Sequence, residues 1–199
     1  MRYVIFFFIY LASISSNAQK DLNLGEVRYD SAFNCNVGRH TVDVNFFVPN
    51  ICESQNDLEI RLRIFIFPGG KRMLIIFSQK DGKWDAKKYT VSGGMLGPSL
   101  TTVSYILPDW NNLSVEQVCT NLIDTLIKSQ LFLLPDQSEL KHELSILDGV
   151  LYIISYKTGT SLRTYSYSNP ESYLKHYPDC KEYARMKEIV STLRHLFYE

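Results

Sequence analysis

The 199-residue sequence has no excess of charge of either sign, because 21 lysines and arginines stand against 21 aspartates and glutamates. Proteins that bind nucleic acid need a basic surface, so we expect no nucleic-acid partner. After the N-terminal stretch, no hydrophobic run reaches the roughly 18 residues of a membrane-spanning helix. The hydrophobic content of 45% is nevertheless too high for a disordered chain. These absences indicate a soluble, folded protein.

The N-terminal stretch has the order of a secretory signal peptide. Arg2 supplies the charge, residues 3–11 are apolar, and small polar residues follow up to Ala18. We expect cleavage between Ala18 and Gln19, so that the chain is not membrane-spanning after signal cleavage. The alternative is an uncleaved anchor, although the apolar stretch is short for spanning. No cysteine precedes Cys35, which argues against a lipoprotein and favours a secreted or periplasmic location.

The sequence contains four cysteines, and an even number in an exported protein most often forms disulfides. Three pairings of Cys35, Cys52, Cys119 and Cys180 are possible. Cys35 and Cys52 are close enough in sequence to join neighbouring strands, while Cys119 and Cys180 both fall near predicted helices. We therefore favour Cys35–Cys52 together with Cys119–Cys180. A zinc site is less favoured, because no Cys-x-x-Cys pair occurs.

Residues 25–107 have the pattern of strands joined by short turns. In residues 58–67, apolar residues from Ile60 to Ile66 share one face, and the charged residues Glu59, Arg61 and Arg63 begin the other, which predicts a strand with one solvated end. Further strands are expected at 73–77 and 84–91, after turns at 68–71 and 81–82. Strands with such short connections are antiparallel neighbours. Residues 42–48 are another candidate strand.

After residue 113 the apolar residues recur at helical spacing. A capping-box pattern at Ser114 and Gln117 begins an amphipathic helix over about 114–130, which we expect to pack on the sheet. Strands follow at 144–147, 150–156 and 161–167, and helices at about 170–176 and 179–197. This order predicts an α+β fold, a mainly antiparallel β-meander sheet with these helices packed on it. We expect a single exported domain over residues 19–199, with a weak candidate boundary near 108–113.

The sequence lacks catalytic, cofactor and metal-ligand signatures. Its four histidines have no ligand spacing, and no nucleophile elbow or phosphate-binding loop is present. The glycine-rich residues 92–98 lack the lysine and the helix that phosphate binding requires, so we interpret them as a flexible loop between strands. Lys87 and Lys88 are interpreted as solvated turn charges. We therefore predict no catalytic residue, no cofactor and no metal.

One feature of the composition is uneven: seven of the 13 tyrosines fall between residues 152 and 183. Cross-strand aromatic pairs stabilise antiparallel sheets, which favours a structural role. Tyrosine also combines an apolar ring with a hydroxyl group, which suits recognition at a half-wet surface. A candidate binding surface is therefore kept beside the structural interpretation, and it consists of Arg163, Tyr165, Tyr167, Tyr173 and Tyr177.

Together these patterns predict a non-catalytic binding or interaction module of the envelope or the medium. Its ligand is an unknown protein, peptide or glycan. The alternative is a hydrolase whose site assembles from distant residues such as His40, Asp43, His142 and Glu143, since a histidine and a carboxylate are neighbours in both segments. The alternative requires that at least two of these side chains meet in a pocket.

Overall fold

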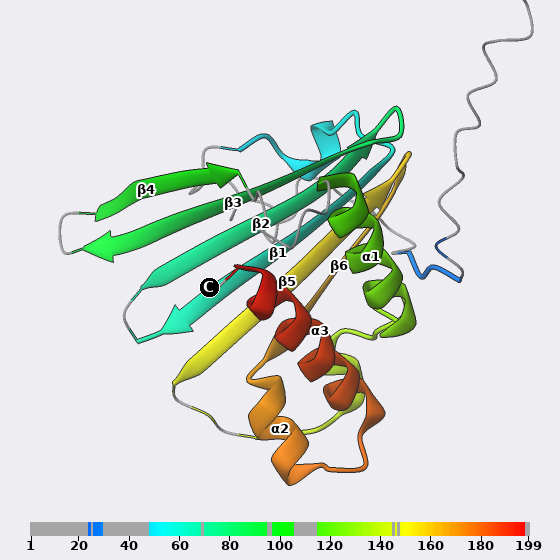
Figure 1. Ribbon diagram of the computed structural model, residues 1–199. Helices are drawn as coiled ribbons and strands as arrows, with labels where there is room; N and C mark the ends of the chain where they lie inside the picture. The colour runs from blue at the N-terminus through cyan, green and yellow to red at the C-terminus, as the bar shows by residue number, and fades with distance from the viewer. Residues whose placement is uncertain are drawn as a thin grey trace, which may run out of the picture.

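Within the described residues, the computed structural model has six strands in one sheet, with helices packed on it (Figure 1). The structure describes residues 24, 26–29, 48–68, 70–94, 97–105, 115–144, 146 and 148–197. The strands are β1 (Leu58–Phe67), β2 (Lys71–Lys80), β3 (Lys83–Gly94), β4 (Gly97–Tyr105), β5 (Gly149–Thr158) and β6 (Ser161–Ser168). The helices are α1 (Val115–Lys128), α2 (Pro170–His176) and α3 (Lys181–Phe197), and two short 3-10 helices are η2 (Ile51–Glu53) and η3 (Gln137–Leu140).

The strand order is β4-β3-β2-β1-β5-β6, and every neighbouring pair is antiparallel. Strands β1 to β4 form a meander because their connections are too short for a crossover. Between β2 and β3, Asp81 and Gly82 both have positive φ angles, 50° and 74°, as a tight hairpin turn requires. The β5–β6 hairpin returns beside β1, so β2 and β1 are the two middle strands of the sheet.

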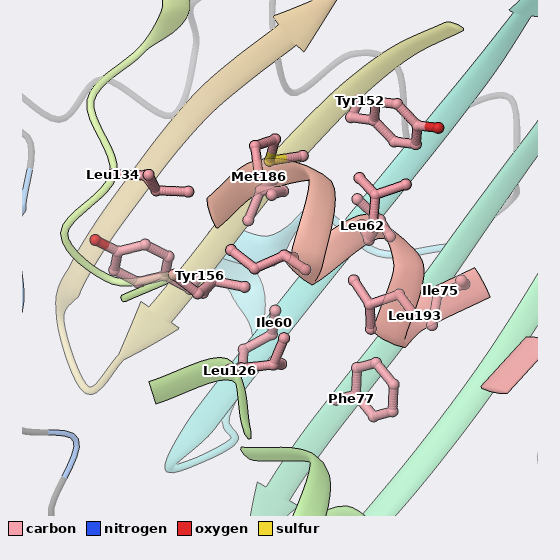
Figure 2. Close-up of a cluster of buried hydrophobic side chains, with 14 of the residues drawn as sticks. Ile60, Leu62, Ile75, Phe77, Leu126, Leu134, Tyr152, Tyr156, Met186 and Leu193 are labelled. Carbon is pink, nitrogen blue, oxygen red and sulfur yellow. The ribbon is translucent and has the colours of Figure 1, made fainter. Parts of the chain in front are cut away.

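The main core lies between the sheet and the helices α1 and α3, which Figure 1 shows on the same side of the sheet. Alternation on β1 places Ile60 and Leu62 on this side, and β5 contributes Tyr152 and Tyr156 in the same way. Figure 2 shows these side chains packed around Met186 of α3. The predicted α+β class, with a meander sheet and packed C-terminal helices, is confirmed.

Two predicted local structures are wrong. Residues 144 and 146 do not lie in a strand. Instead, the hydroxyl groups of Tyr173 on α2 and of Tyr177, which caps α2, donate to the carbonyl groups of Leu144 and Glu143 and hold this segment. Residues 92–94 and 97–98 are not a loop but the ends of β3 and β4, where Gly93 pairs with Pro98. The predictions for residues 1–18, 42–47, 108–113 and Ser114 lie outside the described residues.

Candidate binding site

The predicted tyrosine-rich binding surface is part of the core. Tyr165 and Tyr167 are 0% exposed and Arg163 is 2% exposed. Alternation on β6 turns these three side chains toward the helices, where the Tyr167 ring lies 6.0 Å from the Tyr183 ring of α3. The guanidinium of Arg163 lies 5.3 Å from the centre of the Tyr165 ring. A ligand in solvent does not reach these side chains, so the binding-surface prediction is wrong for them.

The remaining two residues of that surface are also structural. Tyr173 is buried and Tyr177 is half-buried. Their hydroxyl groups donate to backbone carbonyl groups, at 3.2 Å from Tyr173 to Leu144 and at 2.9 Å from Tyr177 to Glu143. These bonds fix α2 to the segment before β5. The tyrosine cluster therefore packs the fold, which is the structural role that the sequence favoured.

The alternative prediction was a hydrolase, and the structure shows no contact between its two described residues, His142 and Glu143. The ring of His142 stacks on Tyr177, with centroids 4.2 Å apart and planes inclined by 12°. Glu143 is exposed. His40 and Asp43 lie outside the described residues. In the described part of the chain, no group of three His, Cys, Asp or Glu side chains is arranged to hold a metal ion.

The cysteines differ from the predicted pairing. Cys119 on α1 and Cys180 before α3 are free thiols, so the predicted Cys119–Cys180 bridge is wrong. Cys119 lies on the apolar stripe of α1 inside the core, and Cys180 donates to the Glu182 carboxylate at 3.3 Å. Cys52 is disulfide-bonded. Its predicted partner, Cys35, lies outside the described residues, so that pairing stays a prediction.

The sheet has a second face, opposite α1 and α3, which we call the far face. Strand register aligns its side chains in rows, because residues directly opposite on neighbouring strands point the same way. Glu59, Ser78 and Asp85 form one row across β1, β2 and β3. Arg61, Ile76 and Lys87 form the next row, so that an acidic row lies beside a basic one.

A buried ion pair lies at the centre of these rows. Glu59 and Arg61 are each 3% exposed, and the Arg61 guanidinium contacts Glu59 Oε1 at 2.6 Å through both Nε and Nη2. The other carboxylate oxygen accepts from Ser54 Oγ and from Asn56 Nδ2. Arg61 Nη1 also donates to the carbonyl of Pro49 at 2.7 Å. Four donors thus surround one carboxylate, and the pair ties the segment before β1 to the sheet.

A hollow of about 270 Å³ opens on the far face above these rows. At its edge, Lys87 Nζ contacts Asp85 Oδ2 at 2.5 Å, with side-chain exposures of 35% for Lys87 and 48% for Asp85. Polar side chains make up most of its lining, which consists of Val48, Pro49, Asn50, Glu53, Ser54, Gln55, Asn56, Glu59, Arg61, Ile76, Ser78, Asp85, Lys87 and Tyr89. We call it the far-face hollow.

The rim of the hollow, residues 49–57, is held in place by the sheet. Lys157 Nζ of β5 donates to the carbonyl of Cys52 at 3.2 Å and to that of Ser54. The backbone N–H of Asp57 donates to the carbonyl of Gln79 at 2.8 Å. Since the opposite wall consists of strand residues, both sides of the hollow are fixed before a ligand arrives.

Sequence reasoning missed this site. The end of β1 that carries Glu59, Arg61 and Arg63 was expected to be solvated, but all three side chains are buried, and the apolar end at Phe67 is 51% exposed. Lys87 was interpreted as a turn charge, yet it lies inside β3. The sequence did contain one signal of a second covered face, because charged residues alternate with apolar ones along the ten residues of β1. Their partners, such as Pro49 and Ser155, are too distant in sequence to be read from it.

Comparison with known proteins adds no relative: no family model, curated protein or solved structure matched the chain. Among the described helices, none combines the length and the apolar character needed to cross a membrane.

Proposed function

We propose that the chain is an exported, non-catalytic binding module whose ligand occupies the far-face hollow. The observation that supports this is a preformed hollow lined by hydrogen-bonding side chains around the buried Glu59–Arg61 pair. A buried ion pair is seldom worth more stability than apolar residues of the same volume. Its presence at this position therefore favours a role in shaping a site over a role in stabilising the core.

The bonding of Glu59 favours binding over acid–base chemistry. A general base must reach the proton that it removes, and it needs a free acceptor position to do so. The carboxylate of Glu59 already has four donors from Arg61, Ser54 and Asn56. It therefore positions its neighbours, and the more exposed polar groups at the edge, Asp85 and Lys87, are the ones that can contact a ligand.

Affinity capture from the native envelope and medium tests the proposal. The exported protein serves as bait beside Lys87→Glu and Tyr89→Ala, which alter the hollow. Lys187→Glu is the matched control, because it makes the same charge change at an exposed position of α3. We expect a molecule that the parent and the control capture and that both hollow variants lose while keeping the parent's thermal stability. Equal capture by all four proteins, or capture of nothing, would contradict the proposal.

The export part of the proposal has its own test. Mass spectrometry of the protein recovered outside the cytoplasm is expected to give a chain that begins at Gln19. Recovery of the uncut chain with the membrane fraction would instead indicate the uncleaved anchor.

A further inference from the structure

We infer that the far-face hollow binds a neutral saccharide of one or two sugar rings, an inference that rests on the proposed function. The first reason is charge. Five charged side chains line the hollow, and four of them are paired on their own strand: Glu59 contacts Arg61 at 2.6 Å, and Asp85 contacts Lys87 at 2.5 Å. The fifth, Glu53, lies in η2. A ligand with a net charge would have to compete with these contacts. A neutral ligand leaves them intact.

The second reason is the arrangement of donors and acceptors. Residues two apart on a strand have Cα atoms roughly 6.7 Å from each other and point to the same face. On β3, this places the acceptor Asp85 beside the donor Lys87, and the carboxamide of Gln55 and the hydroxyl of Ser78 supply further groups of both kinds. A hydroxyl group donates and accepts at once. Neighbouring donors and acceptors therefore suit a ligand that carries several hydroxyl groups.

The third reason is the apolar part of the lining and the size of the hollow. Tyr89 is half-buried against the small apolar cluster of Leu74, Ile76 and Val91, and both Tyr89 and Ile76 also line the hollow. Together they offer an apolar patch to the C–H groups of a sugar ring, and Tyr89 adds a polar hydroxyl group at the end of its ring. A volume of about 270 Å³ lies just below the roughly 300–1,000 Å³ of ordinary ligand pockets, which suits a small ligand.

A peptide ligand is less favoured at this position. Extended peptides bind by adding a strand to a sheet edge. The floor of the hollow comes from β1 and β2, which have strands on both sides, and from β3, which pairs with β4 from Lys87 onward. At the β6 edge, the side chains of Asp136 and Gln137 already accept from the backbone N–H groups of Ser166 and Ser168, at 2.9 and 2.5 Å. A peptide therefore finds no open edge at β1, at β2 or at the part of β3 from Lys87 onward, and none at this end of β6.

Titration of the exported protein with a defined sugar panel tests the inference. The panel contains glucose, galactose, N-acetylglucosamine and cellobiose, with glucuronic acid and glucosamine as charged counterparts. Isothermal titration calorimetry is expected to show a neutral sugar binding with a Kd of about 1 mM or tighter. Tyr89→Ala and Asp85→Asn should each weaken that binding roughly tenfold. Asp124→Asn, at an exposed position of α1, is the control and should leave it unchanged.

Four outcomes would overturn the inference, and they show whether the proposed function fails with it. Tighter binding of the charged sugars would mean that the hollow recognises charge. Capture of a partner that depends on Lys87 and Tyr89, with no binding to any sugar of the panel, would leave the binding function in place and exclude a saccharide. Sugar binding that survives both hollow variants, or no binding of any kind at the hollow, would remove both.

Discussion

The rings of Tyr165 and Tyr167 lie edge to face on one side of β6, with centroids 6.1 Å apart and planes inclined by 86°. Both side chains are fully buried, yet their hydroxyl groups differ. Tyr165 Oη donates to the carbonyl of Leu131 at 2.8 Å, whereas Tyr167 Oη has no hydrogen-bond partner among the described residues. Burial raises the pKa of both hydroxyl groups well above the usual value of a tyrosine. Two similar side chains thus have opposite polar environments.

This difference predicts opposite effects of removing one oxygen atom. Tyr165→Phe should lower the free energy of unfolding by about 1–2 kcal/mol, because the carbonyl of Leu131 loses its donor in the core. Tyr167→Phe should be neutral or stabilising by up to about 1 kcal/mol, because it removes a buried hydroxyl group that has no partner. Urea unfolding of the two variants measures both effects. Equal destabilisation would mean that Tyr167 has an acceptor after all.

The Glu59–Arg61 pair predicts a strong coupling. Arg61→Met should destabilise the protein by about 3 kcal/mol, because the buried Glu59 carboxylate loses two of its four donors. The double variant Glu59→Gln/Arg61→Met should cost at least about 1 kcal/mol less than the two single changes added together. Urea unfolding of the parent, the two single variants and the double variant gives this coupling free energy.

The half-buried pair of Asp85 and Lys87 on β3 is the control for that cycle. Lys87→Met breaks the contact with Asp85, but both side chains are partly solvated, so the change should alter stability by less than about 1 kcal/mol. If the effects of Glu59→Gln and Arg61→Met on the free energy of unfolding are additive, the buried pair contributes no more to stability than the Asp85–Lys87 pair.

The sequence predicts those parts of the fold that depend on patterns within one strand or one helix. The alternation from Leu58 to Phe67 gave the bounds of β1, and the helical spacing of Val118, Leu122 and Leu126 identified the buried side of α1. Periodicity assigns side chains to a face, but it does not say what covers that face. For that reason Tyr165 and Tyr167 were kept as a candidate surface, although both are buried and the Tyr167 ring packs against Tyr183 of α3.

The candidate site is harder to predict for the same reason. Its walls come from η2 and from three strands, and its central residue Glu59 is held by Arg61 from the same strand and by Ser54 and Asn56 from the preceding segment. Arg63 is buried through a contact with Ser155, 92 residues away. A charged residue on a strand is expected in solvent until such partners are known. The burial of the site depends on tertiary contacts that no local pattern contains.

The two free cysteines predict a specific count of reactive thiols. Unfolded in denaturant without reductant, the protein should show two, Cys119 and Cys180. In the native state a maleimide reagent should reach only the half-buried Cys180, and slowly, because burial raises the pKa of its thiol and leaves little thiolate. Peptide mapping after labelling assigns the sites. A count of zero in denaturant would mean that these two cysteines form a disulfide in solution, as the sequence had suggested.

The buried thiol also predicts a loss of stability at alkaline pH. Burial, with a smaller effect from the negative charge of Asp85, raises the pKa of Cys119 from about 9 to about 11. Between these values the unfolded chain has released the proton and the folded chain has kept it, so stability is complete below pH 9 and falls as the pH rises toward 11. The slope is about 1.4 kcal/mol per pH unit for one such group.

Urea unfolding at pH 8, 9 and 10 measures this slope in the parent and in Cys119→Ala. The variant should lose less stability between pH 9 and 10 than the parent, although its stability at pH 8 is lower because the core loses a sulfur atom. In the unfolded chain the thiols ionise near pH 9 and the tyrosines only near pH 10, so the first part of the decline belongs to the thiols. The same slope in the variant and the parent would show that Cys119 is not the group that resists ionisation.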